Sequence, residues 1–213
     1  MGSGLEDGLD CEFAELDDYC DPGCDDPACE VGPLGPEPVG SPALLPVVFV
    51  HGFNAAPGGE RGFNGDLLSI LDGDGHTIYF VELSAHGDVE RRARELARQV
   101  DEILGDADAY ALHIVAHSMG GLDARYLVST LGYADRVVTV STIGTPHGGS
   151  PVADWVLDSF DSQVIDSSGS IIAWLFGVDP AGSDLRGALR DLSVGHSETF
   201  NRDNPDADGV FYQ

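Results

Sequence analysis

A serine between a strand-like segment and a helix-like segment constrains the fold of this chain more than any other feature. Apolar residues 110–116 predict a buried strand, residues 122–131 predict a helix, and Ser118 lies between them. The residues around this serine are small: Ala116, Gly120 and Gly121. A tight strand-to-helix turn needs small neighbours, because larger side chains would collide with the adjacent strand and helix. The pattern Gly-x-Ser-x-Gly, with Ala for the first Gly, therefore predicts a serine hydroxyl that a base and a substrate can reach.

Strand-like and helix-like segments alternate along residues 45–213. Strands are expected at residues 44–50, 77–83, 110–116 and 136–142, and another begins at residue 209. Helices are expected at residues 66–71, 88–105, 122–131 and 183–203. This alternation predicts an α/β protein in which helices cover both faces of a mostly parallel sheet.

The helix after Asp88 is the most regular of these segments. Asp88 is expected to cap its start and Gly105 to end it. Its apolar residues recur at helical spacing, which predicts one buried face. We interpret the arginines on its other faces as a solvated surface, with Arg91 as the candidate that reaches inward.

Length and charge limit the class of protein. At 213 residues, one domain with one sizeable core is the default expectation. No stretch has the ~18 apolar residues of a membrane span, so no transmembrane segment is expected. The formal net charge is −27 and every basic residue is arginine, so the surface should repel nucleic acids and anionic membranes. We therefore expect no nucleic-acid partner.

Residues 1–44 differ in composition from the rest of the chain. They carry twelve acidic residues and no basic residue, with many Pro and Gly, and cannot build a core of their own. We interpret them as an acidic leader or linker. All four cysteines lie in this segment: Cys11, Cys20, Cys24 and Cys29. Two disulfides are favoured over metal binding or free thiols, because the cysteine spacing fits no standard zinc pattern. An extracellular or periplasmic location follows, although no signal peptide is visible at the start.

Residues 151–177 interrupt the alternation. They are rich in large apolar side chains, include both tryptophans of the chain, and predict one or two amphipathic helices. Two interpretations remain open: buried core helices, or a mobile lid over an apolar cleft that contacts a lipid interface. The lid is preferred because the segment follows the last strand's loop, at the end of the sheet where ligands bind.

The serine needs two kinds of help to act as a nucleophile. A base must take its proton, and preorganised donors must stabilise the oxyanion that forms during acyl transfer. The amide of Met119, at the start of the helix after Ser118, is one expected donor. The amide of Phe53 is the other, because Gly52 allows the backbone after an earlier strand to approach the site.

Two histidines lie next to these expected donors in the sequence. His51 is interpreted as structural, holding the loop by bonding to backbone, rather than as catalytic. His117 precedes the nucleophile but projects elsewhere on the turn, so we interpret it as a packing or pocket-lining residue. Together with Gly52, Gly120 and Gly121, these histidines form the motif that supports the site.

These motifs resemble those of bacterial secreted lipases of the α/β-hydrolase fold, the group that includes the Pseudomonas, Burkholderia and Bacillus triacylglycerol lipases. The matching segments are His51-Gly52-Phe53, Ala116-His117-Ser118-Met119-Gly120-Gly121 and Thr142 to Ser150, with Arg91 and Phe200-Asn201 also fitting. Ala116 is similar to the Bacillus members. The resemblance implies that Ser118 is the nucleophile and that the amides of Phe53 and Met119 form the oxyanion hole.

The resemblance leaves the acid and the base unassigned. In the family the triad runs Ser, Asp, His, with the acid and base after two further strands, and here the chain ends as the first of those strands begins. The family's calcium ligands also lie in that part, so no metal ligand or cofactor is identified. Within the chain, His147 belongs to the structural Thr-Pro-His-Gly motif. His196 follows Asp184 and Asp191 and is a weak candidate for the base.

The sequence therefore predicts a carboxylic ester hydrolase of the triacylglycerol lipase type, incomplete at its C-terminal strands. The apolar 151–177 segment favours lipid-like acyl chains as substrates. A non-catalytic α/β-hydrolase-like binding module is the alternative, and an acyltransferase or thioesterase shares the same turn. We expect the given chain to hydrolyse p-nitrophenyl esters poorly or not at all.

Overall fold

Five parallel strands form one sheet in the computed structural model, which describes residues 45–53, 63, 65–85, 87–159 and 185–213. The strands are β1 (Val47–Val50), β2 (Ile78–Phe80), β3 (Leu112–His117), β4 (Val137–Ile143) and β5 (Phe211–Tyr212). Their order in the sheet is β2-β1-β3-β4-β5, and every neighbouring pair is parallel. The predicted α/β class with a parallel sheet is confirmed.

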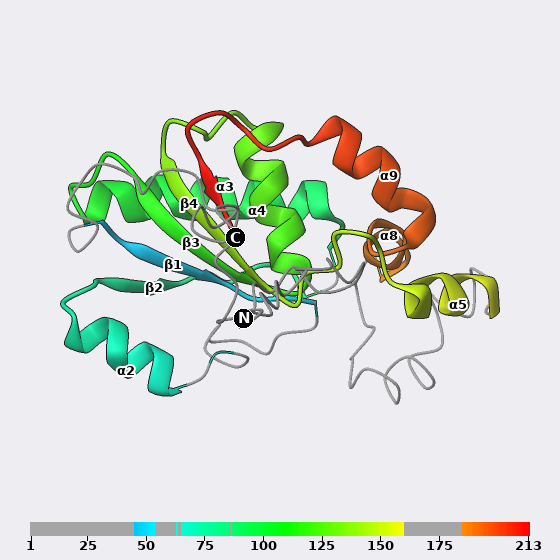
Figure 1. The fold of residues 1–213 in the computed structure, drawn as a ribbon, viewed down its shortest axis with the longest axis horizontal. Coiled ribbons are helices and arrows are strands. Elements are labelled where there is room, and N and C mark those ends of the chain that lie inside the picture. The colour runs from blue at the N-terminus through cyan, green and yellow to red at the C-terminus, as the bar shows by residue number, and fades with distance from the viewer. Residues whose placement is uncertain (1–44, 54–62, 64, 86, 160–184) are drawn as a thin grey trace, which may run out of the picture. The chain divides into compact units, whose positions relative to one another are not determined.

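Helices lie on both sides of this sheet (Figure 1). They are α2 (Gly65–Gly73), α3 (Val89–Asp106), α4 (Met119–Ser129), α5 (Pro151–Ser159), α8 (Leu185–Asp191) and α9 (Val194–Asp203). The connection from β1 to β2 runs in the opposite direction along the sheet from those that lead to β3 and β4. Because such crossovers are right-handed, α2 lies on the opposite face from α3 and α4.

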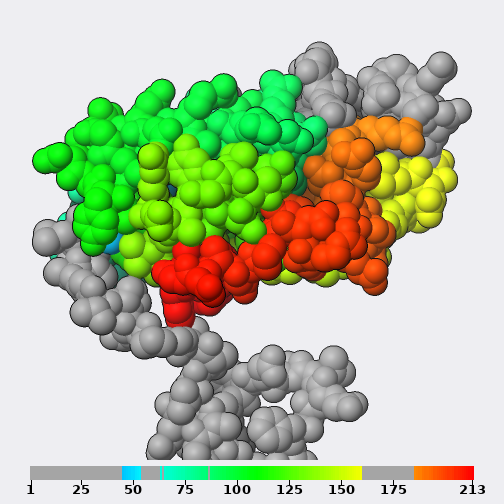
Figure 2. Space-filling view, turned by 90° about the horizontal axis from the view of Figure 1, so that it is seen from above, coloured from blue at the N-terminus to red at the C-terminus, as the bar shows by residue number. Residues whose placement is uncertain are grey.

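The main core lies between the sheet and the α3–α4 pair. Alternate residues of the central strands point into it, such as Val48 and Val50 of β1 and Ile114 and Ala116 of β3, all fully buried. A second apolar cluster joins α5, α8 and α9 to the first turns of α3 and α4. Figure 2 shows α5, α8 and α9 side by side at one end of the molecule, in yellow, orange and red.

Three differences from the sequence predictions have identifiable causes, and the other strand and helix boundaries shift by no more than three residues. Strand β2 is shorter than the predicted residues 77–83, because side chains occupy the backbone groups that would continue it. The Gln99 side chain hydrogen-bonds to both the amide and the carbonyl of Glu82, and His51 Nε2 accepts the Leu83 amide. Helix α3 continues one residue past Gly105, and Asp108 rather than the glycine adopts the left-handed conformation, with φ 48°. The single helix expected at 183–203 is two helices, because Ser193 caps a new start with its hydroxyl, which accepts the His196 amide.

Two predicted segments fall wholly or partly outside the described residues. The leader at 1–44, with its cysteines, is outside them, and of the predicted lid only α5 is described. In α5, Ala153 and Val156 pack into the second apolar cluster, whereas Val152 and Trp155 are exposed. No described helix combines the length and the apolar character that a bilayer span requires.

Candidate active site

Ser118 occupies a strained turn between the end of β3 and the start of α4. Its φ of 52° and ψ of −127° are rare for a residue with a side chain and cost about 1–3 kcal/mol. Both of its backbone groups are held. The amide donates to the Ile143 carbonyl at 2.9 Å, and the carbonyl accepts from the Gly121 amide at 3.1 Å and the Thr145 hydroxyl at 2.8 Å. The surrounding structure therefore imposes the conformation that presents this serine.

The two glycines after the serine are where neighbouring groups approach the backbone of α4. A Cβ on Gly120 would lie 2.6 Å from the Val50 carbonyl oxygen, so this residue packs directly on the end of β1. A Cβ on Gly121 would lie 2.2 Å from the Thr145 hydroxyl oxygen. These distances explain why the turn needs small residues at both positions.

The loop after β1 lies directly against Ser118. A Cβ on Gly52 would lie 2.8 Å from the Ser118 Cβ and 3.3 Å from its hydroxyl oxygen, so only a glycine lets the loop come this close. Phe53 follows, with its side chain packed against the second apolar cluster. On the other side of Ser118, Met119 begins α4, where first-turn amides have no acceptor within the helix. The residues predicted to supply oxyanion donors thus flank the serine from two separate segments.

His51 is a buried structural residue whose two ring nitrogens are both engaged. Nε2 accepts the Leu83 amide at 3.0 Å, so Nδ1 carries the proton and donates to the Gly52 carbonyl at 2.8 Å. Burial lowers the pKa of His51, which keeps the ring neutral. The ring thereby joins the loop after β1 to the loop after β2. His117, at the end of β3, is half-buried, and its ring lies 6.3 Å from that of Phe63.

Arg92 is a buried residue beside the candidate site that the sequence patterns did not single out. Its side chain is fully buried, and its guanidinium donates to three segments: Nη2 to the His51 carbonyl at 2.8 Å, Nη1 to the Ser84 carbonyl at 2.6 Å, and Nε to Asp123 of α4 at 2.8 Å. The prediction that Arg91 reaches inward is wrong. Arg91 is 59% exposed and pairs with Glu95.

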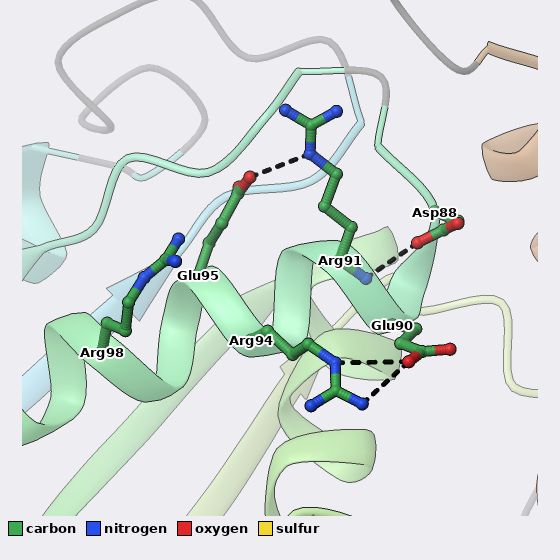
Figure 3. A pocket seen from close by; sticks show the side chains of 6 residues that line it. All are labelled: Asp88, Glu90, Arg91, Arg94, Glu95 and Arg98. Atoms are coloured by element: carbon green, nitrogen blue, oxygen red, sulfur yellow. Dashed lines mark hydrogen bonds and ion pairs between the residues drawn. The ribbon is translucent and has the colours of Figure 1, made fainter.

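A signal for Arg92 was present in the sequence. Arg92 lies three residues after Val89 and four before Leu96, on the apolar stripe of α3, and both of those neighbours are buried. A charged residue on a buried stripe implies a buried partner. The outer face of α3 carries only a shallow pocket of about 490 Å³, lined by surface ion pairs such as Arg94–Glu90 (Figure 3). Ser118 is not among the residues that line this pocket.

His147 is held in a polar network and is not aimed at the serine. Its Nδ1 accepts from Arg125 at 3.2 Å, which places the ring proton on Nε2, 3.2 Å from the Thr142 hydroxyl. Burial and the adjacent Arg125 lower the pKa of His147. Asn201 accepts from the same Arg125 at 2.7 Å and donates to the His147 carbonyl at 2.8 Å. The network ties the loop after β4 to α4 and α9.

His196 pairs with an acid but not with Ser118. Its Nε2 lies 3.6 Å from one carboxylate oxygen of Asp191, whose other oxygen accepts the Val89 amide at 2.8 Å. Asp184 lies outside the described residues. Within the described ranges, no histidine nitrogen hydrogen-bonds to the Ser118 hydroxyl, and no three His, Cys, Asp or Glu side chains gather to hold a metal. The described part of the chain therefore contains the serine and its supporting loops, but no histidine base that is hydrogen-bonded to that serine.

Comparisons with known proteins agree with this geometry. A family model described as the alpha/beta hydrolase family matches residues 47–211. A triacylglycerol lipase of Pseudarthrobacter phenanthrenivorans is 31% identical over 178 residues, which cover 76% of this chain and 54% of that protein. A triacylglycerol lipase of Burkholderia plantarii has the same identity over 178 residues, 76% of this chain and 48% of that protein. The chain thus spans about half the length of these curated relatives.

Among solved structures, the fold is similar to that of a Bacillus licheniformis lipase in its mature form. The TM-score is 0.63 at 24% identity, and the match covers 83% of this chain and 67% of that one. At this identity the likeness concerns the fold alone.

Proposed function

The chain belongs to the alpha/beta hydrolase family, and we propose that its Ser118 is the nucleophile of a carboxylic ester hydrolase of the triacylglycerol lipase type. The observation that carries the proposal is the strained Ser118 turn with Gly52 lying against its hydroxyl. Strained serine turns of this kind, between a buried strand and a helix, present the nucleophile in α/β hydrolases. The similarity to triacylglycerol lipases supports the choice of reaction.

In the proposed reaction, the Ser118 hydroxyl attacks the ester carbonyl carbon, and the tetrahedral intermediate collapses by breaking the ester C–O bond and releasing the alcohol. Water then hydrolyses the resulting acyl-enzyme, which releases the carboxylic acid and restores the serine. The backbone amides of Phe53 and Met119 stabilise the oxyanion of each tetrahedral intermediate. Arg92 and His51 act indirectly, because they hold the loop that carries the Phe53 amide. The base that activates Ser118 is unassigned.

Two further features guide the choice of substrate and location. The exposed Val152 and Trp155 of α5, next to the second apolar cluster, favour a substrate with an apolar acyl chain. We propose that the protein works outside the cytoplasm, consistent with an acidic surface and cysteines confined to the leader.

A fluorophosphonate probe tests the proposal, because it labels a serine only where the site has activated it. The natural full-length product of the gene should be labelled at Ser118 and should hydrolyse tributyrin. Ser118→Ala should abolish both, whereas Ser129→Ala, later on the same helix, should leave both unchanged. Tributyrin hydrolysis that persists in Ser118→Ala would rule out the proposed nucleophile.

The alternative, a non-catalytic binding module, is favoured by one observation: no described histidine hydrogen-bonds to the Ser118 hydroxyl. It predicts that the natural protein is not labelled by the probe at any concentration that labels a control esterase. An acyltransferase or thioesterase would be labelled at Ser118 but would transfer the acyl group to an added alcohol, or cleave a thioester, faster than it hydrolyses tributyrin.

A further inference from the structure

We propose that Asp123 is a positioning residue for the oxyanion loop, the loop after β1 that contains residues 51–53, and that its negative charge holds this loop in place through Arg92. The consequence for catalysis rests on the proposed esterase function, whereas the effect on the loop itself does not. Asp123 lies five residues after Ser118 on α4, and its side chain is fully buried.

The Asp123 carboxylate and the oxyanion loop contact the same nitrogen atom of Arg92, Nη2. Arg92 Nη2 lies 2.8 Å from Asp123 Oδ2 and donates to the His51 carbonyl, also at 2.8 Å, with the Gly52 carbonyl at 3.5 Å. Nε adds a second bond to Oδ2 at 2.8 Å, which makes the pairing bidentate on the arginine side. A shift of the guanidinium therefore moves the hydrogen bonds that hold the loop beside Ser118.

The charges around this pair explain why it is sensitive to a proton. Arginine guanidinium groups do not lose their proton in proteins, so Asp123 is the member of the pair that titrates. Burial raises the pKa of Asp123 to about 6, Arg92 opposes that rise, and the carboxylates of Asp191 on α8 and Glu95 on α3 add to it. Among the described residues, Asp123 Oδ1 has no hydrogen-bond partner and is free to take the proton.

The direction of the effect follows from linkage, since a proton favours the state in which the pKa of the group is higher. With the loop in place, Arg92 lowers the pKa of Asp123. If Arg92 and the loop move away while Asp123 stays buried on α4, the lowering contribution is lost and the pKa rises further. Protonation of Asp123 therefore favours the loosened loop. The oxyanion loop should be firm above the higher pKa of the loosened state, loosen as the pH falls toward about 6, and loosen no further below it.

Hydrogen–deuterium exchange measured against pH tests the inference without any catalytic readout. After correction for the intrinsic pH dependence of exchange, amides in residues 47–53 and 82–85 should exchange at least tenfold faster at pH 5.0 than at pH 7.5. In Asp123→Asn the same amides should exchange fast at both pH values. Asp101→Asn, which neutralises the exposed partner of the surface pair with Arg136, should behave like the wild type.

Several outcomes would overturn the inference. Wild-type exchange that stays flat between pH 5.0 and 7.5 would do so, and so would an Asp123→Asn variant that titrates like the wild type. If Asp123→Asn does not fold, the wild-type titration still decides. A rise in exchange between pH 7.5 and about 6 that is confined to these two segments supports the proposal, and its absence refutes it.

An activity measurement separates the two proposals. If Ser118 is acylated, Asp123→Asn should lower kcat about tenfold at pH 7.5 with little change in KM, because the oxyanion donors act in the transition state. Failure of Ser118 labelling would refute the esterase proposal and leave the exchange result standing. Normal labelling with a flat exchange profile would refute only the role of Asp123.

Discussion

The hydroxyl of Thr145 donates a hydrogen bond to the carbonyl oxygen of Ser118 at 2.8 Å, which joins the loop after β4 to the turn that carries Ser118. The same threonine fills the space that a side chain on Gly121 would need. Thr145 therefore holds the strained Ser118 turn and leaves room only for a glycine at position 121. Neither Thr145 nor Gly121, taken alone in the sequence, would indicate this relationship.

Replacing Thr145 should loosen the serine turn. Thr145→Val keeps the shape but removes the donor, so we expect a loss of about 0.5–1.5 kcal/mol in the free energy of unfolding. The rate of fluorophosphonate labelling should fall with it, because the strained φ of Ser118 is less well held. Thr145→Ser keeps the hydroxyl and is the control. Urea unfolding and labelling rates check both, and equal behaviour of the two variants would contradict the role of this hydrogen bond.

Adding a methyl group to Gly52 should displace the loop from Ser118. The new Cβ would lie 2.8 Å from the Ser118 Cβ and 3.0 Å from the His117 carbonyl oxygen, closer than atoms tolerate. A displacement of about 1 Å at a reacting group can cost roughly 100-fold in rate, so we expect a loss of that size in Ser118 labelling.

Gly105→Ala is the matched control for Gly52→Ala, since nothing lies within 4 Å of a Cβ at that position in α3. It should leave labelling unchanged and raise the free energy of unfolding by roughly 0.5–1 kcal/mol, because alanine favours a helix over glycine. Undiminished labelling of Gly52→Ala would show that the loop does not lie against the serine.

Two adjacent arginines should respond very differently to the same substitution. Arg92→Met removes a fully buried cation and leaves Asp123 buried without a counterion, so a loss of about 3–5 kcal/mol is expected. Arg91→Met removes an exposed partner of Glu95 and should change stability by no more than about 0.5 kcal/mol. Urea unfolding distinguishes them, and a mild effect of Arg92→Met would contradict the buried role assigned here.

His51 and the half-buried His147 should make the free energy of unfolding fall as the pH drops below neutrality. Burial lowers the folded-state pKa of His51 and His147 below the ordinary value of 6.5, so their contribution is complete above about pH 6.5 and is lost below it. Asp123 acts in the opposite direction, but only between its ordinary pKa of 3.8 and about 6. The interval from pH 7.5 to 6.0 therefore reports mainly on the histidines.

Urea unfolding at those two pH values should show a lower free energy of unfolding at pH 6.0. The difference should shrink in His51→Gln, which lacks the titrating ring and is less stable at both pH values because it disturbs the Leu83 hydrogen bond. A pH difference that is undiminished in His51→Gln would assign the effect to other groups.

Much of the architecture could be predicted from the sequence, because each element has its own local pattern. The apolar run at β1, the Asp88 cap and the small residues around Ser118 all report on their immediate surroundings. The error at β2 arose because a distant group intervened. The Gln99 side chain hydrogen-bonds to the backbone of Glu82 and so shortens β2, although 17 residues separate Gln99 from Glu82.

The difference between Arg91 and Arg92 shows the same limit. Both are arginines on one helix, and helical spacing alone leaves the partner of each undefined. Arg92 is buried because Asp123, 31 residues away, and three carbonyls from two other loops meet at its guanidinium. Only the arrangement of β1, β2, α3 and α4 in space brings those groups together.

The class of fold, the place of Ser118 at a strand-to-helix turn and the resemblance to a hydrolase family could all be predicted from the sequence, since these depend on residues close to one another in the chain. The tertiary structure decided what holds that serine and its loop in place: Thr145 on the Ser118 carbonyl, and the Arg92–Asp123 pair on the His51 carbonyl. The physical reason is that a buried charge or hydroxyl must find its partner across the core, and the sequence does not state which distant group supplies it.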